Sequence, residues 1–357
     1  MSESRVLDRY RLLGRSGLRV SPLALGTMTF GTDWGWGCDE AEALRMFEGY
    51  IEQGGNFIDT ANLYTNGTSE ELVGKFAQGR RNRLIIATKY TFTTDPDDVN
   101  SGGNHRKSML HSVERSLKRL KTDFIDLLYL HAWDATTPVD EILRAMDDLV
   151  RVGKVLYIGV SNTMAWQVSR MQAVAELRGW TPLVALQIPY SLLERTAEHE
   201  LIPMAREMGL GTIAWAPLAG GLLTGKYMTR DRGWSPPKSV SNSLRKDLVV
   251  EDGGLSERNL RVMNVVMNVA AETEKSPAQV SLAWLLSRSG LVSLLVGART
   301  LNQLNENIRV MEVELTRSQC DQLDEISQIE PGFPHAYLAK LMASQYMSGA
   351  MKIAKAT

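Results

Sequence analysis

The chain has 357 residues, with 40 lysines and arginines against 41 aspartates and glutamates, and a formal net charge of −1. Its 44% of hydrophobic and 23% of charged residues are ordinary for a globular protein and argue against a coiled coil or a disordered chain. The balanced charge removes the main electrostatic reason to expect nucleic acid or an anionic membrane surface as a partner.

Three further features concern the setting of the protein. No apolar run reaches the length of about 18 residues that a membrane-spanning helix needs. Residues 1–11 are polar and charged and lack the apolar centre of a signal peptide. The two cysteines, Cys38 and Cys320, are too few for a disulfide framework and show no metal-ligand spacing. We therefore expect a cytoplasmic protein with no metal site.

The predicted elements begin with a hairpin over residues 10–20, which turns at residues 14–17. Short apolar runs rich in β-branched residues then predict eight strands buried on both faces. These strands lie at residues 20–25, 56–59, 84–89, 124–131, 155–160, 183–187, 212–215 and 292–296. Helical patterns occupy residues 39–53, 69–76, 106–120, 138–152, 164–177, 198–208, 259–275, 277–287 and 301–311.

Eight strand–helix units indicate either a doubly wound sheet or a closed (β/α)8 barrel. A barrel of this type needs about 250 residues, so one such domain accounts for nearly all of the chain. The glycine fingerprint of a doubly wound dinucleotide fold does not follow the first strand. We therefore predict an α/β fold, a TIM barrel with an N-terminal hairpin, in a single domain over residues 1–357 with a core at about 18–325.

Two segments fall outside the repeat. Residues 228–254 are long and polar, which is typical of a lid, a binding loop or a disordered segment. The tail, residues 330–357, carries several large apolar side chains. We predict an added helix that packs on the barrel, with a disordered end or a flap over the pocket as alternatives.

Polar side chains end successive predicted strands. Asp59, Lys89 and His131 end the second, third and fourth, and the following strands end near Ser161, Asn162, Gln187 and Trp215. Each has a purely structural reading: a cap, a surface lysine or a hydrogen-bonded core histidine. Because active sites of TIM barrels lie at the C-terminal ends of the strands, their joint occurrence on one rim predicts a site.

Tyr64 follows Asp59 by five residues, so a short loop can return its phenol over the barrel mouth. A phenol has a pKa of about 10 and holds a proton at neutral pH. A neighbouring Lys89 ammonium would stabilise the phenolate and lower that pKa, and Asp59 could hold Lys89 in place. His131 could then orient a substrate carbonyl, which gives a general acid site. An alternative is that Lys89 is the Schiff-base lysine of an aldolase.

Six ordered motifs carry a family resemblance. They are GGNFIDTANLY at residues 54–64, IATK at 86–89, DLLYLH at 126–131, GKVLYIGVSN at 153–162, WAPLAGGLLTGK at 215–226 and VGART at 296–300. With these motifs the chain resembles the aldo-keto reductase superfamily over nearly its whole length. The form of the last motif and the longer inserts are most similar to the bacterial and potassium-channel β-subunit-like branches.

The resemblance implies a barrel that binds NADP(H), in preference to NAD(H), and a catalytic tetrad of Asp59, Tyr64, Lys89 and His131. It implies hydride transfer between the nicotinamide and a carbonyl carbon, with Tyr64 supplying the proton, and the reverse oxidation of an alcohol. A redox-sensing regulatory subunit, like the channel β-subunits, is the alternative function. The expected partner is a small carbonyl or alcohol substrate, and a homo-oligomer is compatible with this branch.

The resemblance also places the cofactor. Ser161, Asn162 and Gln187 match positions that bind the nicotinamide carboxamide, and Trp215 matches the position that stacks on the ring. Arg299 and Thr300 match positions beside the adenosine 2′-phosphate, where an arginine fork suits a dianion. Gln303 replaces a basic residue there, which weakens the preference for NADP(H). The remaining cofactor positions are Gly26, Thr27, Met28, Asp59, Ala216, Pro217, Leu218, Gly220, Lys226, Gly297, Glu306 and Asn307, of which Glu306 and Asn307 match adenine contacts.

The substrate is less well defined by the sequence. Candidate pocket residues on the loops after the strands are Phe30, Trp34, Trp36, Phe92 and Trp133. The two indoles of Trp34 and Trp36 could form apolar walls for an aromatic or polycyclic carbonyl. Their alternative role is to pack the loop on the barrel surface.

Overall fold

The computed structural model describes residues 5–229, 231, 233, 254–342, 346 and 349. Eight parallel strands form a closed barrel, paired in the order β10-β3-β4-β5-β6-β7-β8-β9. Because β10 pairs with β3, the sheet is a barrel and the doubly wound alternative is excluded. The predicted (β/α)8 class is confirmed. The strands are β3 (Leu23–Gly26), β4 (Phe57–Asp59), β5 (Ile85–Tyr90), β6 (Ile125–Leu130), β7 (Val155–Ser161), β8 (Leu183–Pro189), β9 (Gly211–Trp215) and β10 (Leu291–Gly297).

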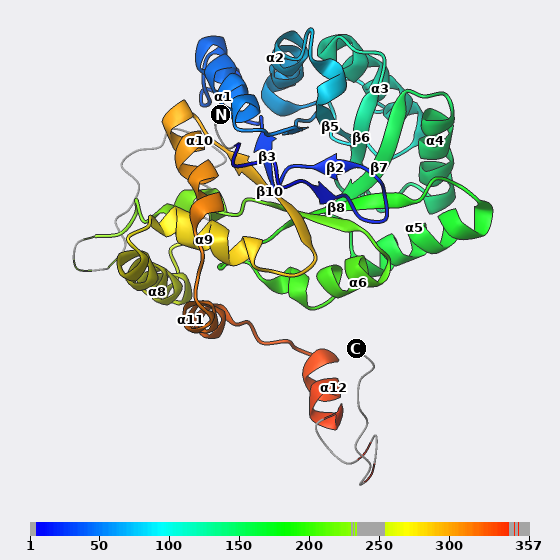
Figure 1. Ribbon diagram of the computed structural model, residues 1–357. Helices are drawn as coiled ribbons and strands as arrows, with labels where there is room; N and C mark the ends of the chain where they lie inside the picture. The colour runs from blue at the N-terminus through cyan, green and yellow to red at the C-terminus, as the bar shows by residue number, and fades with distance from the viewer. Residues whose placement is uncertain are drawn as a thin grey trace.

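Helices surround the barrel, as Figure 1 shows. The α-helices are α1 (Glu40–Glu52), α2 (Thr68–Phe76), α3 (Arg106–Leu120), α4 (Val139–Arg151), α5 (Ala165–Arg178), α6 (Leu201–Glu207), α8 (Glu257–Thr273), α9 (Pro277–Leu286), α10 (Leu301–Ile308), α11 (Arg317–Ser327) and α12 (His335–Met342). Short 3-10 helices are η1 (Tyr64–Gly67), η2 (Arg81–Arg83), η3 (Thr196–Glu198), η4 (Ala219–Thr224) and η6 (Arg309–Glu312). None of the helices in the described ranges combines the length and apolar content that a membrane crossing requires.

The helix boundaries follow from local sequence signals. The Asp39 side chain accepts a hydrogen bond from the Glu42 N–H at 2.9 Å and so caps the start of α1. Beyond the end of α1, Gly54 has a φ of 89°, which a residue without a Cβ adopts at little cost. These are the two signals that predict this helix from the sequence.

The N-terminal hairpin closes one end of the barrel. It consists of β1 (Arg11–Leu12) and β2 (Arg19–Val20), and Figure 1 shows it in dark blue across the barrel. Leu13 and Val20 have no exposed surface and pack in one cluster with the inward-facing Phe57. This cluster fills the N-terminal end of the barrel. The polar residues that end the strands lie at the opposite end.

The first barrel strand and the helix before the tail differ from the predictions. The first barrel strand begins at Leu23 and not at residue 20, because Val20 belongs to the hairpin and the chain bends at Pro22. The Ser21 hydroxyl donates to Leu23 O at 2.8 Å. Helix α11 was not predicted. It has a capping box between Thr316 and Gln319, but Leu323 is its only buried large side chain, so its apolar pattern is weak.

The tail forms the predicted helix, α12, but the expectation that it packs on the barrel is wrong. None of its residues is buried, and Figure 1 shows it standing away from the barrel. Residues 343–345, 347–348 and 350–357 of the tail lie outside the described residues, as does most of the loop predicted at 228–254.

Candidate active site

Three of the predicted catalytic residues are brought together by the alternation of the strands. Ala87 on β5 packs inside the barrel, so Lys89, two residues on, also points inward. The same reasoning holds for Asp59 after Phe57 on β4 and for His131 after Tyr129 on β6. Since these strands are neighbours, their three last inward side chains meet at one edge of the mouth.

Lys89 and Asp59 form a buried ion pair. The Lys89 ammonium donates to Asp59 Oδ1 and, at 2.8 Å, to Thr60 O. Gln187 Nε2 donates to the other Asp59 oxygen, Oδ2, at 2.7 Å. Burial alone would lower the pKa of Lys89, but Asp59 and Tyr64 outweigh it, and the pKa is raised. Lys89 is therefore a cation at neutral pH.

Tyr64 lies beside this pair at the start of η1. Lys89 Nζ donates to Tyr64 Oη at 3.3 Å and lies 4.9 Å from the ring centroid. Burial raises the pKa of Tyr64 above its ordinary value, while Lys89 opposes the rise. The expectation of a lowered pKa is therefore wrong in its net direction, although the effect of Lys89 has the expected sign. The phenol is protonated at neutral pH.

His131 completes the group. Its ring lies 6.0 Å from the Tyr64 ring and 4.7 Å from that of Phe92, centroid to centroid. Burial, with a contribution from Lys89, lowers the pKa of His131 from 6.5 to about 2, so the imidazole is neutral. Its Nδ1 is buried and meets no hydrogen-bonding partner among the described residues.

The residues predicted to hold a nicotinamide lie beside the tetrad at the ends of β7, β8 and β9. Ser161 Oγ and Trp215 Nε1 are buried and lack a hydrogen-bonding partner within the described part of the chain. Asn162 Nδ2 donates to His131 O at 2.9 Å, and Gln187 contacts Asp59 directly. Buried polar atoms without a partner are uncommon in proteins, and at this place they suit a polar group bound in the mouth.

The remaining predicted cofactor positions lie in two places, one at the ends of β3 and β10 and one in the chain that follows β9. Gly26 and Gly297 face each other in the pairing of β3 with β10, and a Cβ on Gly297 would approach no neighbouring atom closer than 4.0 Å. Thr27 is fully buried and bonded to Asp59 O, whereas Met28 is exposed. After β9 the backbone turns at Ala216, with a φ of 48°, and the chain continues through Pro217, Leu218 and Gly220 to the exposed Lys226.

The predicted adenosine positions gather around the start of α10. Thr300 caps this helix by accepting a hydrogen bond from the Gln303 N–H at 3.3 Å. Gln303 Oε1 in turn accepts from the Arg299 N–H at 2.9 Å, and the Arg299 side chain is exposed. Asn307 is buried and Glu306 half-buried in the last turns of the same helix. The exposed guanidinium thus stands at a helix N-terminus, a favourable place for a phosphate.

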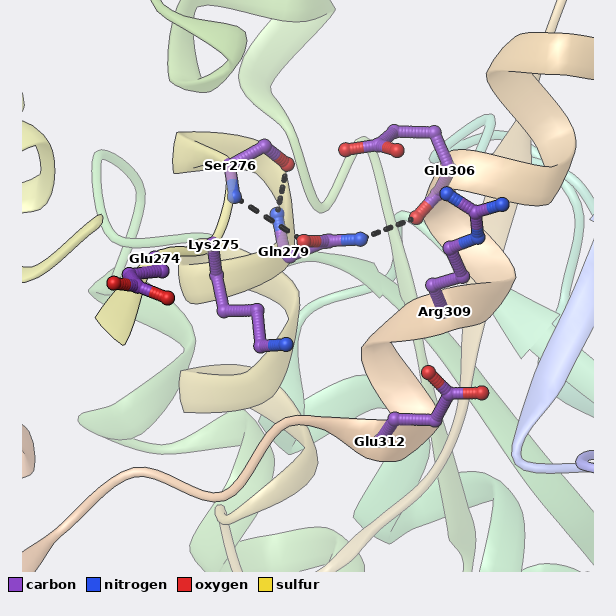
Figure 2. A pocket seen from close by; sticks show the side chains of 7 residues that line it. All are labelled: Glu274, Lys275, Ser276, Gln279, Glu306, Arg309 and Glu312. Carbon is purple, nitrogen blue, oxygen red and sulfur yellow. Dashed lines mark hydrogen bonds between the residues drawn. The ribbon is translucent and has the colours of Figure 1, made fainter. Parts of the chain in front are cut away.

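Glu306 also lines a polar pocket of about 410 Å³ (Figure 2). Gln279 Nε2 donates to Glu306 O at 3.2 Å across it. Sequence reasoning did not predict its other lining residues, which are Glu274, Lys275, Ser276, Gln279, Arg309 and Glu312. It lies between the start of α9 and the end of α10, away from the tetrad.

Of the predicted substrate residues, Trp34 and Phe92 contact the tetrad, and Trp36 contacts Trp34. Trp34 lies 6.4 Å from Tyr64 and 5.8 Å from Trp36, measured between ring centroids, and its Nε1 donates to Asn66 Oδ1 at 3.3 Å. Phe92 is exposed and packs on His131. Phe30 and Trp133 are placed differently: Phe30 is fully buried against Phe76, and Trp133 is half-buried against the helix-facing core.

Sequence reasoning missed Asn62. It is 1% exposed, and neither amide atom of its side chain has a partner among the described residues. It lies within the loop that joins Asp59 to Tyr64, so its position in the sequence could have marked it as a site residue. In the described ranges, no three His, Cys, Asp or Glu side chains come together as a metal site requires.

Comparisons with known proteins identify the family of the chain. The chain matches the Aldo/keto reductase family over residues 22–328. It is 41% identical to the uncharacterized oxidoreductase YrpG of Bacillus subtilis over 330 residues, which cover 89% of this chain and 95% of that protein. It is 34% identical to the norsolorinic acid reductase of Aspergillus flavus, with 96% of this chain and 87% of that protein covered. The aldo-keto reductase ausK of Emericella nidulans is also 34% identical, with 92% and 84% covered. The chain belongs to the aldo/keto reductase family.

Proposed function

We propose that the protein is an NADP(H)-dependent oxidoreductase that interconverts aldehydes or ketones with alcohols, and that Tyr64 is its general acid and base. The observation that carries the proposal is the 3.3 Å contact between Tyr64 Oη and Lys89 Nζ, with Asp59 behind the ammonium. The family, with relatives named as oxidoreductases and reductases, makes this chain an oxidoreductase of carbonyl and alcohol groups.

The tetrad provides a proton where it is needed. The phenol of Tyr64 is protonated at neutral pH and can pass its proton to the oxygen of a carbonyl that is being reduced. The phenolate left behind lies beside the Lys89 ammonium, which stabilises its charge. Neutral His131 can hydrogen-bond the substrate oxygen and fix its position. A reduced nicotinamide bound at this mouth would supply the hydride.

The residues at the mouth fit a nicotinamide nucleotide. Ser161, Asn162 and Gln187 would hold the carboxamide, and Trp215 would cover one face of the ring. Ser161 Oγ and Trp215 Nε1 are buried and have no hydrogen-bonding partner among the described residues, which supports this assignment. The exposed Arg299 beside the N-terminus of α10 supports NADP(H) over NAD(H), because an arginine fork matches a 2′-phosphate.

The aldolase alternative is disfavoured by the charge of Lys89. A Schiff-base lysine attacks a carbonyl as the neutral amine, and enzymes obtain it by lowering the pKa of the lysine. Here the pKa of Lys89 is raised by Asp59 and Tyr64 against the opposite effect of burial. The pair holds a permanent cation beside the phenol, which suits acid–base catalysis.

We further propose that the substrates are aryl or polycyclic carbonyl compounds. Trp34 lies beside Tyr64 and Phe92 beside His131, and Trp36 extends the aromatic surface through its contact with Trp34. Planar rings stack favourably on such surfaces. Four of the relatives are named as norsolorinic acid reductases.

The test is NADPH consumption with a panel of aryl aldehydes, quinones and ketones, for wild type and Tyr64→Phe. The variant removes the proton donor alone, so we expect turnover to fall about a hundredfold or more while NADPH still binds. Tyr337→Phe, on the exposed helix α12, is the matched control and should behave as wild type. Retained turnover in Tyr64→Phe would contradict the assignment, and binding of NADPH without turnover of any compound would favour a regulatory subunit.

A further inference from the structure

Glu70 is a charged side chain that the proposed reaction does not use. It lies in the first turn of α2 and has no exposed surface. Thr88 Oγ1 donates to its Oε1 at 2.5 Å, and Arg119 Nε donates to its Oε2 at 2.7 Å. A buried carboxylate is costly unless it is paired, so this three-residue cluster fixes its members tightly.

The cluster joins three elements around the tetrad. Glu70 belongs to α2, Arg119 to α3, and Thr88 to β5, immediately before Lys89. Because side chains alternate along a strand, Thr88 faces the helices while Lys89 faces the barrel interior. The hydroxyl of Thr88 therefore ties the backbone that carries the Lys89 ammonium to the helix that follows Tyr64.

The chain between Tyr64 and α2 is strained. Thr65 and Asn66 have φ values of 46° and 56°, and Gly67 has a φ of 102°. A β-branched residue at positive φ is an outlier, and such backbone strain persists only where the surroundings enforce it. The Tyr64 turn therefore needs support from outside itself.

Arg119 provides part of that support. Its Cδ lies 3.0 Å from the point where a Cβ on Gly67 would stand, so the side chain packs directly against the turn. The Thr65 hydroxyl donates to Phe30 O at 2.7 Å and accepts from the Ser69 N–H at 3.1 Å, which holds the turn from the other side. Glu70 keeps Arg119 in place through their ion pair.

We propose that Glu70, Thr88 and Arg119, here called the Glu70 clamp, set the distance between Tyr64 Oη and Lys89 Nζ, and that Glu70 is a positioning residue for the reaction. The clamp acts from behind the site and contacts neither substrate nor cofactor. This inference rests on the proposed function, since it assumes that Tyr64 is the acid.

The clamp has a consequence for pH dependence. Burial and, to a smaller extent, Asp59 raise the pKa of Tyr64, whereas Lys89 lowers it, and the influence of Lys89 falls with distance. A loosened clamp should therefore raise the pKa of Tyr64 further and move the alkaline limb of the reduction rate to higher pH. It should also lower kcat, since proton transfer requires the aligned pair.

The experiment uses two clamp variants of the full-length enzyme. Thr88→Val keeps the shape of the side chain and removes only the hydroxyl, and Glu70→Gln removes the charge. We expect kcat to fall about tenfold in each, because a small misplacement of a catalytic group is costly. The alkaline limb should move upward, while the Kd for NADPH stays within about twofold of wild type. If Glu70→Gln does not fold, Thr88→Val carries the test.

A second buried carboxylate that is bonded to a threonine and an arginine is the control. Asp147 on α4 is 2% exposed, accepts from Thr181 Oγ1 at 2.9 Å and is paired with Arg151 at 2.6 Å. Asp147→Asn and Thr181→Val should lower the melting temperature without moving kcat or the pH profile. If the clamp variants behave like these controls, the clamp is structural only and the inference is overturned. Retained turnover in Tyr64→Phe would instead overturn the proposed function.

Discussion

His131 is held neutral by its surroundings, which affects stability in acid. Burial lowers its pKa from 6.5 to about 2, so between these values the unfolded chain binds a proton that the folded chain does not. Stability is therefore lost as pH falls below 6.5. At about pH 5 the loss should reach about 2 kcal/mol. Urea unfolding at about pH 7 and pH 5 measures it.

His131→Asn should remove that part of the acid sensitivity. His111→Asn is the control, because His111 is exposed on α3 and its loss should leave the sensitivity as in wild type. An equal loss of stability on acidification in wild type and His131→Asn would mean that His131 is protonated in the folded protein.

Arg299 should read the 2′-phosphate of the cofactor. Arg299→Ala should weaken NADPH binding about tenfold or more, since a charge-assisted hydrogen bond contributes roughly 1.5–3 kcal/mol, and should change NADH binding much less. Fluorescence titration with both nucleotides measures the ratio. Arg309→Ala, an exposed arginine at the polar pocket, is the control and should leave the ratio unchanged. Equal weakening of both nucleotides would contradict the assignment.

At the scale of single residues, the sequence predicted where the site residues lie better than it predicted their pKa shifts. Asp59, Lys89 and His131 could be placed together because each ends a strand run and strand alternation fixes its direction. The net pKa shift of Tyr64 could not be predicted, because it depends on how deeply the loop is covered by other parts of the chain. Glu70 was missed for the same reason, since its partners Thr88 and Arg119 lie on other elements.

At the scale of elements, α11 and α12 contrast sharply. Helix α11 was missed, yet Arg195 donates to Ser327 Oγ at 2.7 Å and Trp284 donates to Asp324 Oδ1 at 3.1 Å, so it is bound to the body. Helix α12 was expected to pack, yet none of its residues is buried. A helical pattern shows that a helix can form, whereas its partner depends on surfaces distant in sequence.

Two truncations test this contrast. A chain that ends at residue 329 lacks α12 and should melt within about 2 °C of wild type, because no residue of α12 is buried. A chain that ends at residue 315 also lacks α11, with its buried Leu323 and Ser327, and should melt at least about 5 °C lower. Calorimetry of both chains measures the midpoints. A large loss on removal of α12 alone would contradict its placement.

At the scale of the whole molecule, local sequence patterns predicted the number of strands. They did not by themselves decide whether the sheet closes into a barrel. The same eight strand–helix units suit an open sheet or a barrel, and the choice depended on length and on a missing glycine fingerprint. Closure results from the pairing of Leu23–Gly26 with Leu291–Gly297, strands from opposite ends of the chain. Such a pairing has no local signature, because it is fixed only when all the intervening units are in place.

The two ends of the barrel should separate stability from activity. Leu13 has no exposed surface and fills the N-terminal end, whereas the tetrad lies at the other end. Leu13→Ala should therefore lower the free energy of unfolding by about 2–5 kcal/mol and leave kcat and the KM for NADPH close to wild type at a temperature where the variant is folded. Its neighbour Leu12 is 56% exposed, so Leu12→Ala should change stability by no more than about 0.5 kcal/mol. Urea unfolding and steady-state kinetics on the same preparations provide both quantities. A fall in kcat in folded Leu13→Ala would show that the hairpin end is coupled to the tetrad through the barrel, and the separation of roles between the two ends would then be wrong.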